Sequence, residues 1–582
     1  MLTTKRSARL DRGKIPRRPA LRCSALASGV ALSLGLVASA SAFQVNTGNP
    51  DIDIAWDTTL RYNLGVRAES IGQVGNSSTS DEGEYFADKG DIVTNRLDVL
   101  TEFDFLYQGD YGFRVSAAGW YDHAYRDAES TRNPELSAPG SYVDDKYSNY
   151  TKRYYRGPSG EVLDAFVFGR FYLGDMPLSV RLGQHTIYWG ESLSLGASLN
   201  GIAYSQSPLD LIKGFANPGT GAKELFLPLN QISAELIATD TVSVAANYYF
   251  DWDHTRFPEG GTYLGPADFI AFGTDGLIPG VVNNEGIVKP ETRGDWGIQT
   301  LWRPYWLDGT LGFYYRNFTD KIPAFYLNGS DYRTYFGEDI DLFGISLGKQ
   351  VGSMSLGAEV SYRNNMPLVA RTLGQAAYDP VLHPNGPPEL IDNSFQARGK
   401  TLHGSASLLG MLPKSPLWDT GSFRAEVIYA RLQSVDKNED MYHGVGYGTC
   451  DASRREELGA NFRDEGDQCA TDDMWGISLT AAPTWLQVFP GVNLSMPLAY
   501  SHTLKGNAPT QLGGNEGNGN YSIGVSADLY SQYTVALNYI DYFGDVKRTE
   551  NENGDTAITG ANGLSTLLRD RGWVSLMVTA TF

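Results

Sequence analysis

The chain has 582 residues, of which 42% are hydrophobic and 20% charged, and this composition excludes wholesale disorder. Asp and Glu outnumber Lys and Arg by 67 to 47, which gives a formal net charge of −20 at pH 7. A chain this acidic repels phosphate backbones, so nucleic acid is excluded as a partner.

The first 42 residues are typical of a secretory signal peptide. Residues 1–22 carry eight basic residues and one acidic residue, and a short apolar run follows at 25–38. This run is too short to span a membrane as a helix, which takes about 20 apolar residues. Ala40-Ser41-Ala42 supplies a small-x-small site, so we expect cleavage after Ala42 and an exported mature chain of residues 43–582.

The mature chain begins with a long alternating segment. From Ile52 to Val66 every even position is apolar, aromatic or Thr, and the odd positions are polar or small. A period of two predicts a β-strand with one apolar and one polar face. The same alternation returns at 96–107, 113–118, 242–248 and 354–363. A membrane strand needs about nine to eleven residues, so the longer of these segments can cross a bilayer.

The connections between the predicted strands alternate in length. Eight short ones fall near 108–112, 174–177, 239–241, 306–309, 349–353, 413–421, 486–491 and 531–532. Nine long ones fall near 68–91, 124–162, 190–229, 253–293, 320–338, 364–398, 433–473, 502–520 and 544–571. Short turns at one end and long loops at the other are typical of outer-membrane barrels. We therefore expect an all-β fold, a transmembrane antiparallel β-barrel of about 18 strands, with 16 also open.

The last predicted strand, 573–582, supports an outer-membrane location. Its even positions are apolar and it ends on Phe582, which resembles the C-terminal signal that the barrel-assembly machinery reads. We therefore expect the outer membrane of a Gram-negative bacterium, with its lipid and the assembly machinery as partners. Aromatic residues near strand ends are expected in an interfacial girdle, among them Tyr107, Trp302, Trp306 and Trp573.

The predicted inward faces carry seven arginines, Arg61, Arg96, Arg114, Arg181, Arg316, Arg363 and Arg424. They could form a ladder that guides carboxylates or other anions through the barrel. The favoured interpretation is that they pair with acids of the same faces, namely Asp57, Asp98, Glu102, Asp104, Glu359 and Glu426. The chain has no Gly-x-Ser-x-Gly or His-Glu-x-x-His motif, so we expect no enzyme and no catalytic, cofactor or metal site.

The segment 190–229 is long, modestly charged and rich in apolar residues. Such a loop would be a liability in water, so we expect it to fold into the barrel as a plug or constriction. An external cap is the alternative. In a plug, Asp210, Lys223 and Glu224 would be held by the wall, with Arg181 and Glu191 as candidate partners. The candidate lumen and plug residues are Arg61, Arg114, Arg181, Trp189, Glu191, Asp210, Lys223, Glu224, Arg316, Arg363 and Arg424.

Several motifs resemble a domain-of-unknown-function family of proteobacterial outer-membrane barrel proteins. The motifs are Arg181-x-Gly183 with Trp189-Gly190-Glu191-Ser192, Pro208-x-Asp210, Pro218-Gly219 with Lys223-Glu224, Ser361-Tyr362-Arg363-Asn364 and Phe489-Pro490-Gly491-Val492 with Pro497. Members are typically encoded beside a periplasmic partner and an RND-type inner-membrane permease. The resemblance therefore implies a conduit for hydrophobic or lipid-like molecules, served by a periplasmic lipid carrier and such a permease.

Two other functions stay open. One is a substrate-selective porin for small organic anions that uses the arginine positions. The other is a surface or anchoring protein that transports nothing. The sequence names neither the substrate nor the direction of transport.

The acidic loop 433–473 holds Cys450 and Cys469, the two cysteines of the expected mature chain. Two cysteines in an exported chain usually pair, so we expect a disulfide in this external loop.

Overall fold

The computed structural model describes residues 43–45, 47–72, 83–131, 140–218, 220–268, 271–328, 331–370, 386, 388–459, 462–550 and 556–582. The predicted signal peptide, its cleavage site after Ala42, and Gly219 of one family motif lie outside the described residues.

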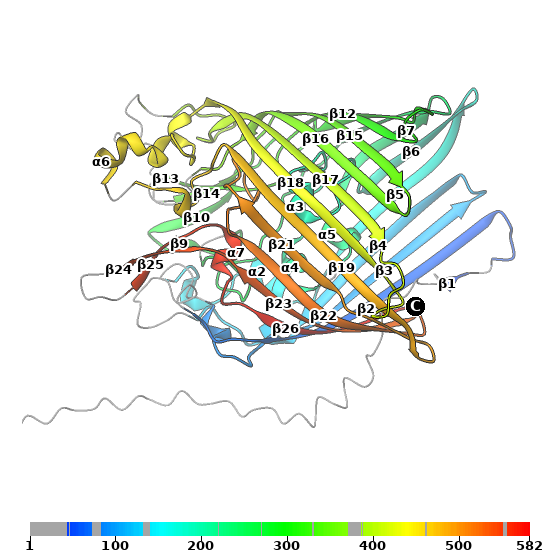
Figure 1. The fold of residues 1–582 in the computed structure, drawn as a ribbon, viewed down its shortest axis with the longest axis horizontal. Coiled ribbons are helices and arrows are strands. Elements are labelled where there is room, and N and C mark those ends of the chain that lie inside the picture. The colour runs from blue at the N-terminus through cyan, green and yellow to red at the C-terminus, as the bar shows by residue number, and fades with distance from the viewer. Residues whose placement is uncertain are drawn as a thin grey trace, which may run out of the picture.

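Eighteen antiparallel strands close into one barrel, as the alternating connections predict (Figure 1). The first nine are β2 (Ile52–Arg67), β3 (Ile92–Tyr107), β4 (Tyr111–Asp122), β5 (Ser159–Leu173), β6 (Met176–His185), β7 (Leu229–Ile237), β8 (Val242–Tyr249), β11 (Trp296–Trp302) and β12 (Gly309–Phe318). The others are β15 (Ile340–Val351), β16 (Met354–Pro367), β17 (Arg398–Met411), β18 (Thr420–Lys437), β19 (Asp473–Phe489), β20 (Val492–Ser495) with β21 (Leu498–Lys505), β22 (Gly519–Leu529), β23 (Tyr533–Phe543) and β26 (Trp573–Thr581). β20 and β21 count as one strand, because they pair with β22 in a single register on either side of Met496-Pro497.

The barrel closes where the last strand meets the first. β26 pairs with β2 from Arg67 opposite Trp573 to Thr59 opposite Thr581. Phe582 continues the pairing, because its amide donates to the carbonyl oxygen of Thr58 at 3.0 Å. Beyond that point a short strand, β1 (Phe43–Gln44), pairs with the same edge of β2. Both edges of the closing strand are therefore satisfied by main-chain hydrogen bonds.

The two faces of the barrel differ as the period of two predicts. On β2, Arg61, Asn63 and Arg67 point inward and are buried, whereas Trp56 is 52% exposed on the outer surface. The outer surface also exposes Leu97, Val167, Leu182, Ile298, Phe343, Val360, Val427, Leu479, Val525 and Leu537. An apolar exterior around a polar interior is the pattern of a barrel in a membrane.

The connections divide between two ends (Figure 1). The short turns and the C-terminus lie at one end, and the long loops lie at the other. The long loops contain α2 (Asn149–Tyr155), α6 (Arg455–Leu458), α7 (Leu564–Leu567), the sheet of β9 (Gly276–Ile278), β10 (Val282–Ile287), β13 (Ala324–Asn328) and β14 (Asp331–Tyr335), and the hairpin of β24 (Val546–Glu550) and β25 (Thr556–Ala561). Among the described residues, no helix is both long and apolar enough to span a bilayer.

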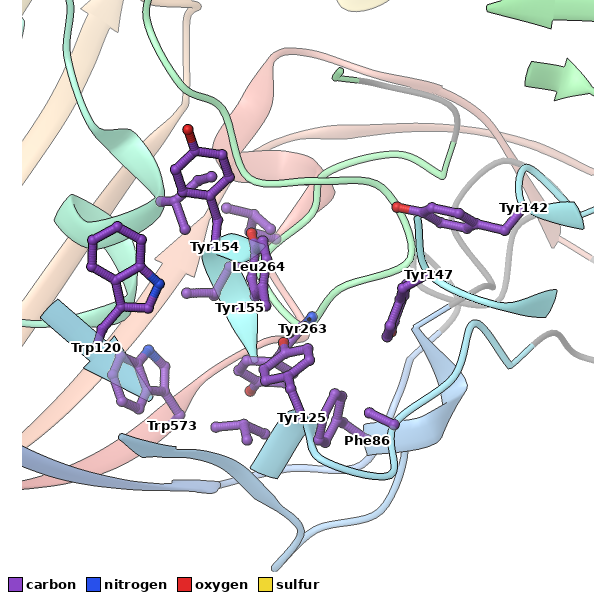
Figure 2. Close-up of a cluster of buried hydrophobic side chains, with 14 of the residues drawn as sticks. Phe86, Trp120, Tyr125, Tyr142, Tyr147, Tyr154, Tyr155, Tyr263, Leu264 and Trp573 are labelled. Carbon is purple, nitrogen blue, oxygen red and sulfur yellow. Dashed lines mark hydrogen bonds between the residues drawn. The ribbon is translucent and has the colours of Figure 1, made fainter. Parts of the chain in front are cut away.

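A cluster of aromatic side chains packs beneath the long loops (Figure 2). It includes Phe86, Trp120, Tyr125, Tyr147, Tyr155, Tyr263 and Trp573. Trp573 is 1% exposed, so its assignment to the interfacial girdle is wrong. The reason is its register, because odd positions of β26, such as Ser575 and Thr579, face the interior. Trp302 and Trp306 are exposed at the short-turn end, where a girdle residue is expected.

Candidate functional site

Residues 186–218 and 220–228, between β6 and β7, run through the inside of the barrel and are called the inserted segment. Its short helices are α3 (Leu195–Leu199), α4 (Leu211–Ala216) and α5 (Ala222–Leu225), which lie within the ring of strands (Figure 1). Ser194 and Asp210 cap α3 and α4 by accepting hydrogen bonds from the main-chain amides of Ala197 and Lys213. Many apolar residues of the segment are buried, among them Leu199, Ile202, Tyr204, Leu209, Leu211 and Ile212, whereas Leu193 is 42% exposed.

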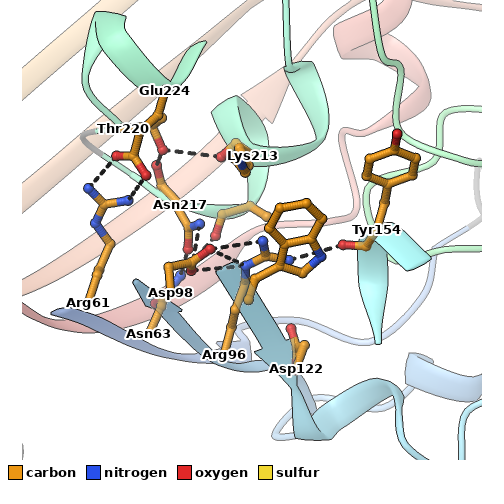
Figure 3. Close-up of polar contacts among 12 residues, drawn as sticks. Arg61, Asn63, Arg96, Asp98, Asp122, Tyr154, Lys213, Asn217, Thr220 and Glu224 are labelled. Atoms are coloured by element: carbon orange, nitrogen blue, oxygen red, sulfur yellow. Dashed lines mark hydrogen bonds and ion pairs between the residues drawn. The ribbon is translucent and has the colours of Figure 1, made fainter. Parts of the chain in front are cut away.

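Two ion pairs join α5 to the first strands of the wall, and Figure 3 shows the one between Arg61 and Glu224. Nη2 of Arg61 on β2 lies 2.7 Å from Oε2 of Glu224, and both side chains are buried. Lys223 pairs with Glu102 on β3. The predicted plug residues of α5 therefore do contact the wall, through partners that differ from the predicted ones.

Asn217, at the end of α4, extends this contact along β3. Its Nδ2 donates to Oδ2 of Asp98 at 3.2 Å, and Arg96 donates to Asp98 from the same strand at 2.9 Å. Asn63 on β2 donates to the carbonyl oxygen of Ala216 at 2.8 Å. The C-terminal end of α4 is thus held by side chains of two neighbouring strands.

Three inward arginines hold the other side of the inserted segment by its main chain. Nη1 of Arg316 on β12 donates to the carbonyl oxygens of Ile202 at 2.8 Å and Tyr204 at 2.7 Å. Nη2 of Arg363 on β16 donates to Gly201 at 2.9 Å, and Nη1 of Arg424 on β18 donates to Leu193 at 2.6 Å. The wall therefore contacts the segment from β2 and β3 on one side and from β12, β16 and β18 on the other.

The inward acids of β16 and β18 also bind the segment. Glu359 accepts hydrogen bonds from the amides of Glu191 at 2.7 Å and Ile202 at 3.2 Å. Glu426 accepts one from the amide of Leu193 at 2.7 Å. Glu359 and Glu426 therefore bind the segment. The predicted pairing of inward arginines with inward acids is found elsewhere, for Arg96 with Asp98 at 2.9 Å and for Arg114 with Asp104 at 2.7 Å.

Arg181 and Glu191 do not hold the charges of α4 and α5. The Arg181 guanidinium lies over the ring of Phe166, 5.8 Å from its centroid. Asp210 instead pairs at 3.0 Å with Arg256, from the loop after β8. This part of the prediction is wrong because the charges of α4 and α5 lie beside other partners, Arg256 for Asp210, Glu102 for Lys223 and Arg61 for Glu224.

Asp210 belongs to a buried network of two acids and two bases. Arg256 also pairs with Glu161 on β5 at 2.7 Å, and Lys213 pairs with Glu161 at 2.9 Å. Each charge therefore has an opposite charge within hydrogen-bond distance, which a buried ion needs. The network fixes α4 to both the wall and a long loop.

Wall glycines make room for the inserted segment, and sequence reasoning missed them. A Cβ added to Gly297 on β11 would lie 2.8 Å from the ring of Trp189. One added to Gly344 on β15 would lie 2.7 Å from Ile202, and one on Gly357 of β16 would lie 3.0 Å from Cβ of Glu191. The signal was present in the sequence, because glycine is costly inside a strand unless another group approaches closely.

Opposite that contact, a cavity of about 1150 Å³ lies between the inserted segment and β19–β23, with Arg424 and Ile428 of β18 at its edge. The segment contributes an apolar side, with Leu193, Leu195, Leu199, Leu211 and Phe215. The strands contribute a mostly polar side, with Ser478, Thr480, Ser501, Thr503, Asn520, Ser522 and Arg424. At the long-loop end the lining includes Arg463, Asp467 and Gln468.

Cys450 and Cys469 form the predicted disulfide in the loop after β18. Nδ1 of His443 lies 3.4 Å from Sγ of Cys450. These three residues are close enough for a metal site, but both thiols are used in the disulfide. The bridged loop reaches the cavity through residues between the two cysteines.

The comparison with solved structures identifies outer-membrane proteins of similar length. Acinetobacter baumannii OccAB4 has 9% identity and a TM-score of 0.39, covering 92% of this chain and all of its own. Pseudomonas aeruginosa OpdK, solved with vanillate, has 11% identity and a TM-score of 0.38, covering 91% of this chain and 98% of its own. No curated protein matches the chain.

The family comparison is more informative. The model described as "Protein of unknown function (DUF1302)" matches residues 23–582, which include every motif of the resemblance inferred from the sequence. The chain therefore belongs to the DUF1302 family.

Proposed function

We propose that the protein is a substrate-selective channel of the Gram-negative outer membrane, narrowed by the inserted segment to a passage along β18–β23. The observation that carries this proposal is the cavity between that segment and the wall. Contacts from β2, β3, β12, β16 and β18 hold the segment in place. The segment therefore acts as a fixed constriction, and a solute passes beside it.

The chemistry of the lining favours amphipathic organic acids over sugars or inorganic ions. One side is apolar, the strands carry hydroxyl and amide groups with the Arg424 guanidinium, and Arg463 and Asp467 lie at the long-loop end. A molecule with a hydrocarbon part and a carboxylate can contact both sides at once. Its hydrocarbon part packs on the apolar side, and its carboxylate accepts hydrogen bonds from the polar side. The preferred function is thus a selective porin for small organic anions.

The apolar side favours a second candidate, a conduit for hydrophobic or lipid-like molecules. The apolar part of the lining includes Leu193, Leu195, Leu199, Phe215 and Leu512. In this case a periplasmic lipid carrier and an RND-type permease would deliver or remove the cargo. The two candidate functions differ in one measurable property. A negative charge on the solute should increase its transport through an anion-selective porin but not through a conduit for hydrophobic molecules.

The test is to narrow the passage with a larger side chain at a strand position that lines the cavity. Ser522 on β22 lines the cavity, whereas Val525 on the same strand is 49% exposed on the outer surface. We expect Ser522→Trp to reduce single-channel conductance and solute uptake into liposomes, and Val525→Trp to leave both unchanged. A wild type without conductance or uptake would refute the channel and favour an anchoring role. Equal transport in the wild type and Ser522→Trp would mean that solutes do not follow this wall.

A further inference from the structure

Arg424 differs from the other inward arginines in what its guanidinium can reach. Of the seven, all of which are described, only Arg424 lines the cavity. Arg61, Arg96 and Arg114 pair with carboxylates. Arg316 and Arg363 are fully buried against carbonyl oxygens, and Arg181 lies over Phe166.

The Arg424 guanidinium has hydrogen-bonding capacity to spare. Its Nη1 donates to the carbonyl oxygen of Leu193 at 2.6 Å. Its Nε is buried without a hydrogen-bond partner among the described residues, so the donors left for a solute are those of the Nη atoms. No described carboxylate forms an ion pair with this guanidinium. Glu426, two residues along β18, accepts from the amide of Leu193 and does not line the cavity. A guanidinium offers five donors and suits a carboxylate in particular.

Hydroxyl groups surround the same end of the cavity. Thr480 pairs directly with Arg424 across β18 and β19, and both line the cavity. They are the lining residues of these strands nearest the short-turn end. Ser478 and Ser522 line it on β19 and β22. Hydroxyls can donate to the oxygen of a carboxylate that the guanidinium holds.

Apolar lining residues lie next to Arg424. Leu193, whose carbonyl oxygen accepts from Arg424, lines the cavity with Leu195 and Leu199 of the inserted segment. Ile428 adds an apolar contact from β18, four residues beyond Arg424. A bound carboxylate would therefore have its hydrocarbon chain along the inserted segment.

From this arrangement we infer that Arg424, with Thr480, forms a carboxylate-binding subsite for apolar monocarboxylic acids, whose hydrocarbon part lies along Leu193, Leu195 and Leu199. The inference rests on the proposed channel function and names the substrate class of that passage. It assigns selectivity for the charged group to Arg424 alone among the seven inward arginines.

The experiment compares hexanoate with hexanamide, which has the same shape and no charge. Uptake of both is measured in liposomes that hold the wild type, Arg424→Gln, Arg424→Lys or Arg181→Gln. We expect Arg424→Gln to lower hexanoate uptake by about tenfold, the loss of one charge-assisted hydrogen bond, and to leave hexanamide uptake unchanged. Arg424→Lys should retain most hexanoate uptake. Arg181→Gln removes an equal charge from outside the subsite and should change neither.

The outcomes separate the subsite from the channel. Wild-type uptake of both probes with no effect of Arg424→Gln overturns the subsite and leaves the channel intact. An equal loss of hexanoate uptake in Arg181→Gln and Arg424→Gln also overturns the subsite, because the loss then follows the total charge of the barrel interior. No wild-type uptake of either probe overturns the channel for this class and the subsite with it. Heat-modifiable gel mobility verifies that each variant is a folded barrel.

Discussion

Arg61 on β2 and Glu224 on α5 form a buried ion pair, with Nη2 of the arginine 2.7 Å from Oε2 of the glutamate. The two residues are 163 positions apart in the sequence. The pair links the first strand of the barrel to the last helix of the inserted segment. Removing one partner leaves the other charge buried, which costs more than losing the attraction alone.

The first prediction is that Glu224→Ala destabilises the protein by about 3–5 kcal/mol, the usual cost of an unpaired buried charge. The double variant Arg61→Leu with Glu224→Leu should lose much less, because neither charge remains. Denaturant unfolding in detergent micelles measures both. A Glu224→Ala variant as stable as the wild type would mean that water reaches the pair.

The second prediction concerns the constriction. Deletion of residues 195–222 removes α3 and α4, and with them Leu195, Leu199, Leu211 and Phe215 from the apolar side of the cavity. We expect a large, steady conductance in planar bilayers, where the wild type shows a small one. Deletion of residues 277–286 in the β9–β10 hairpin, which does not line the cavity, should leave the wild-type conductance. Equal conductance after the 195–222 deletion would show that the segment does not limit flow.

The period of two is sufficient to predict the strands, their faces and the closed barrel. The alternation of apolar and polar positions within each strand shows which face is apolar. Arg61, Arg316 and Arg363 can therefore be placed inside the barrel from the local sequence alone. Their partners cannot be predicted in this way, because contacts across a lumen join residues far apart in the chain. Trp573 is a different case, because its odd position on β26 already places it inside, and its assignment to the girdle rested on residue type alone.

The charged residues of α4 and α5 illustrate what a motif can and cannot specify. Asp210, Lys223 and Glu224 are predicted plug contacts, and all three form ion pairs. The identity of each partner depends on where the segment turns, and no local pattern encodes that turn. Wall glycines such as Gly344 escape sequence reasoning because a single glycine in a strand has several explanations.

The third prediction concerns the disulfide. Replacing Cys450 and Cys469 with Ser opens a loop with a sequence separation of 19 residues. In the chain-entropy model the loss is about 3 kcal/mol for a loop of this size. Because Arg463, Asp467 and Gln468 of this loop line the cavity, we expect more current noise and faster proteolysis between residues 451 and 468. Unchanged noise and proteolysis would mean that other contacts hold the loop.

The fourth prediction is a pH dependence in the long loops, at Glu259. This residue lies outside the strands, is fully buried, and accepts hydrogen bonds from the amides of Phe272 at 3.2 Å and Gly273 at 2.6 Å. Burial raises the pKa of the Glu259 carboxyl to about 8 from an ordinary value of 4.5. Because a buried position disfavours the charged form, the folded loop favours the protonated carboxyl over the carboxylate.

The sign of the pH dependence follows from linkage. A raised carboxyl pKa contributes stability that is complete below pH 4.5 and is lost as the pH rises through about 8. Hydrogen exchange at the amides of Phe272 and Gly273, corrected for the intrinsic rate, should therefore lose protection as the pH rises from 4.5 to about 8. Glu259→Gln keeps an acceptor oxygen and cannot ionise, so its corrected protection should be flat over this range. Glu285→Gln, at an exposed position of the same connection, is the matched control and should follow the wild type. If the wild type and Glu259→Gln gave the same profile, the carboxyl would not control this loop, and its burial would have to be compensated by a group that titrates with it.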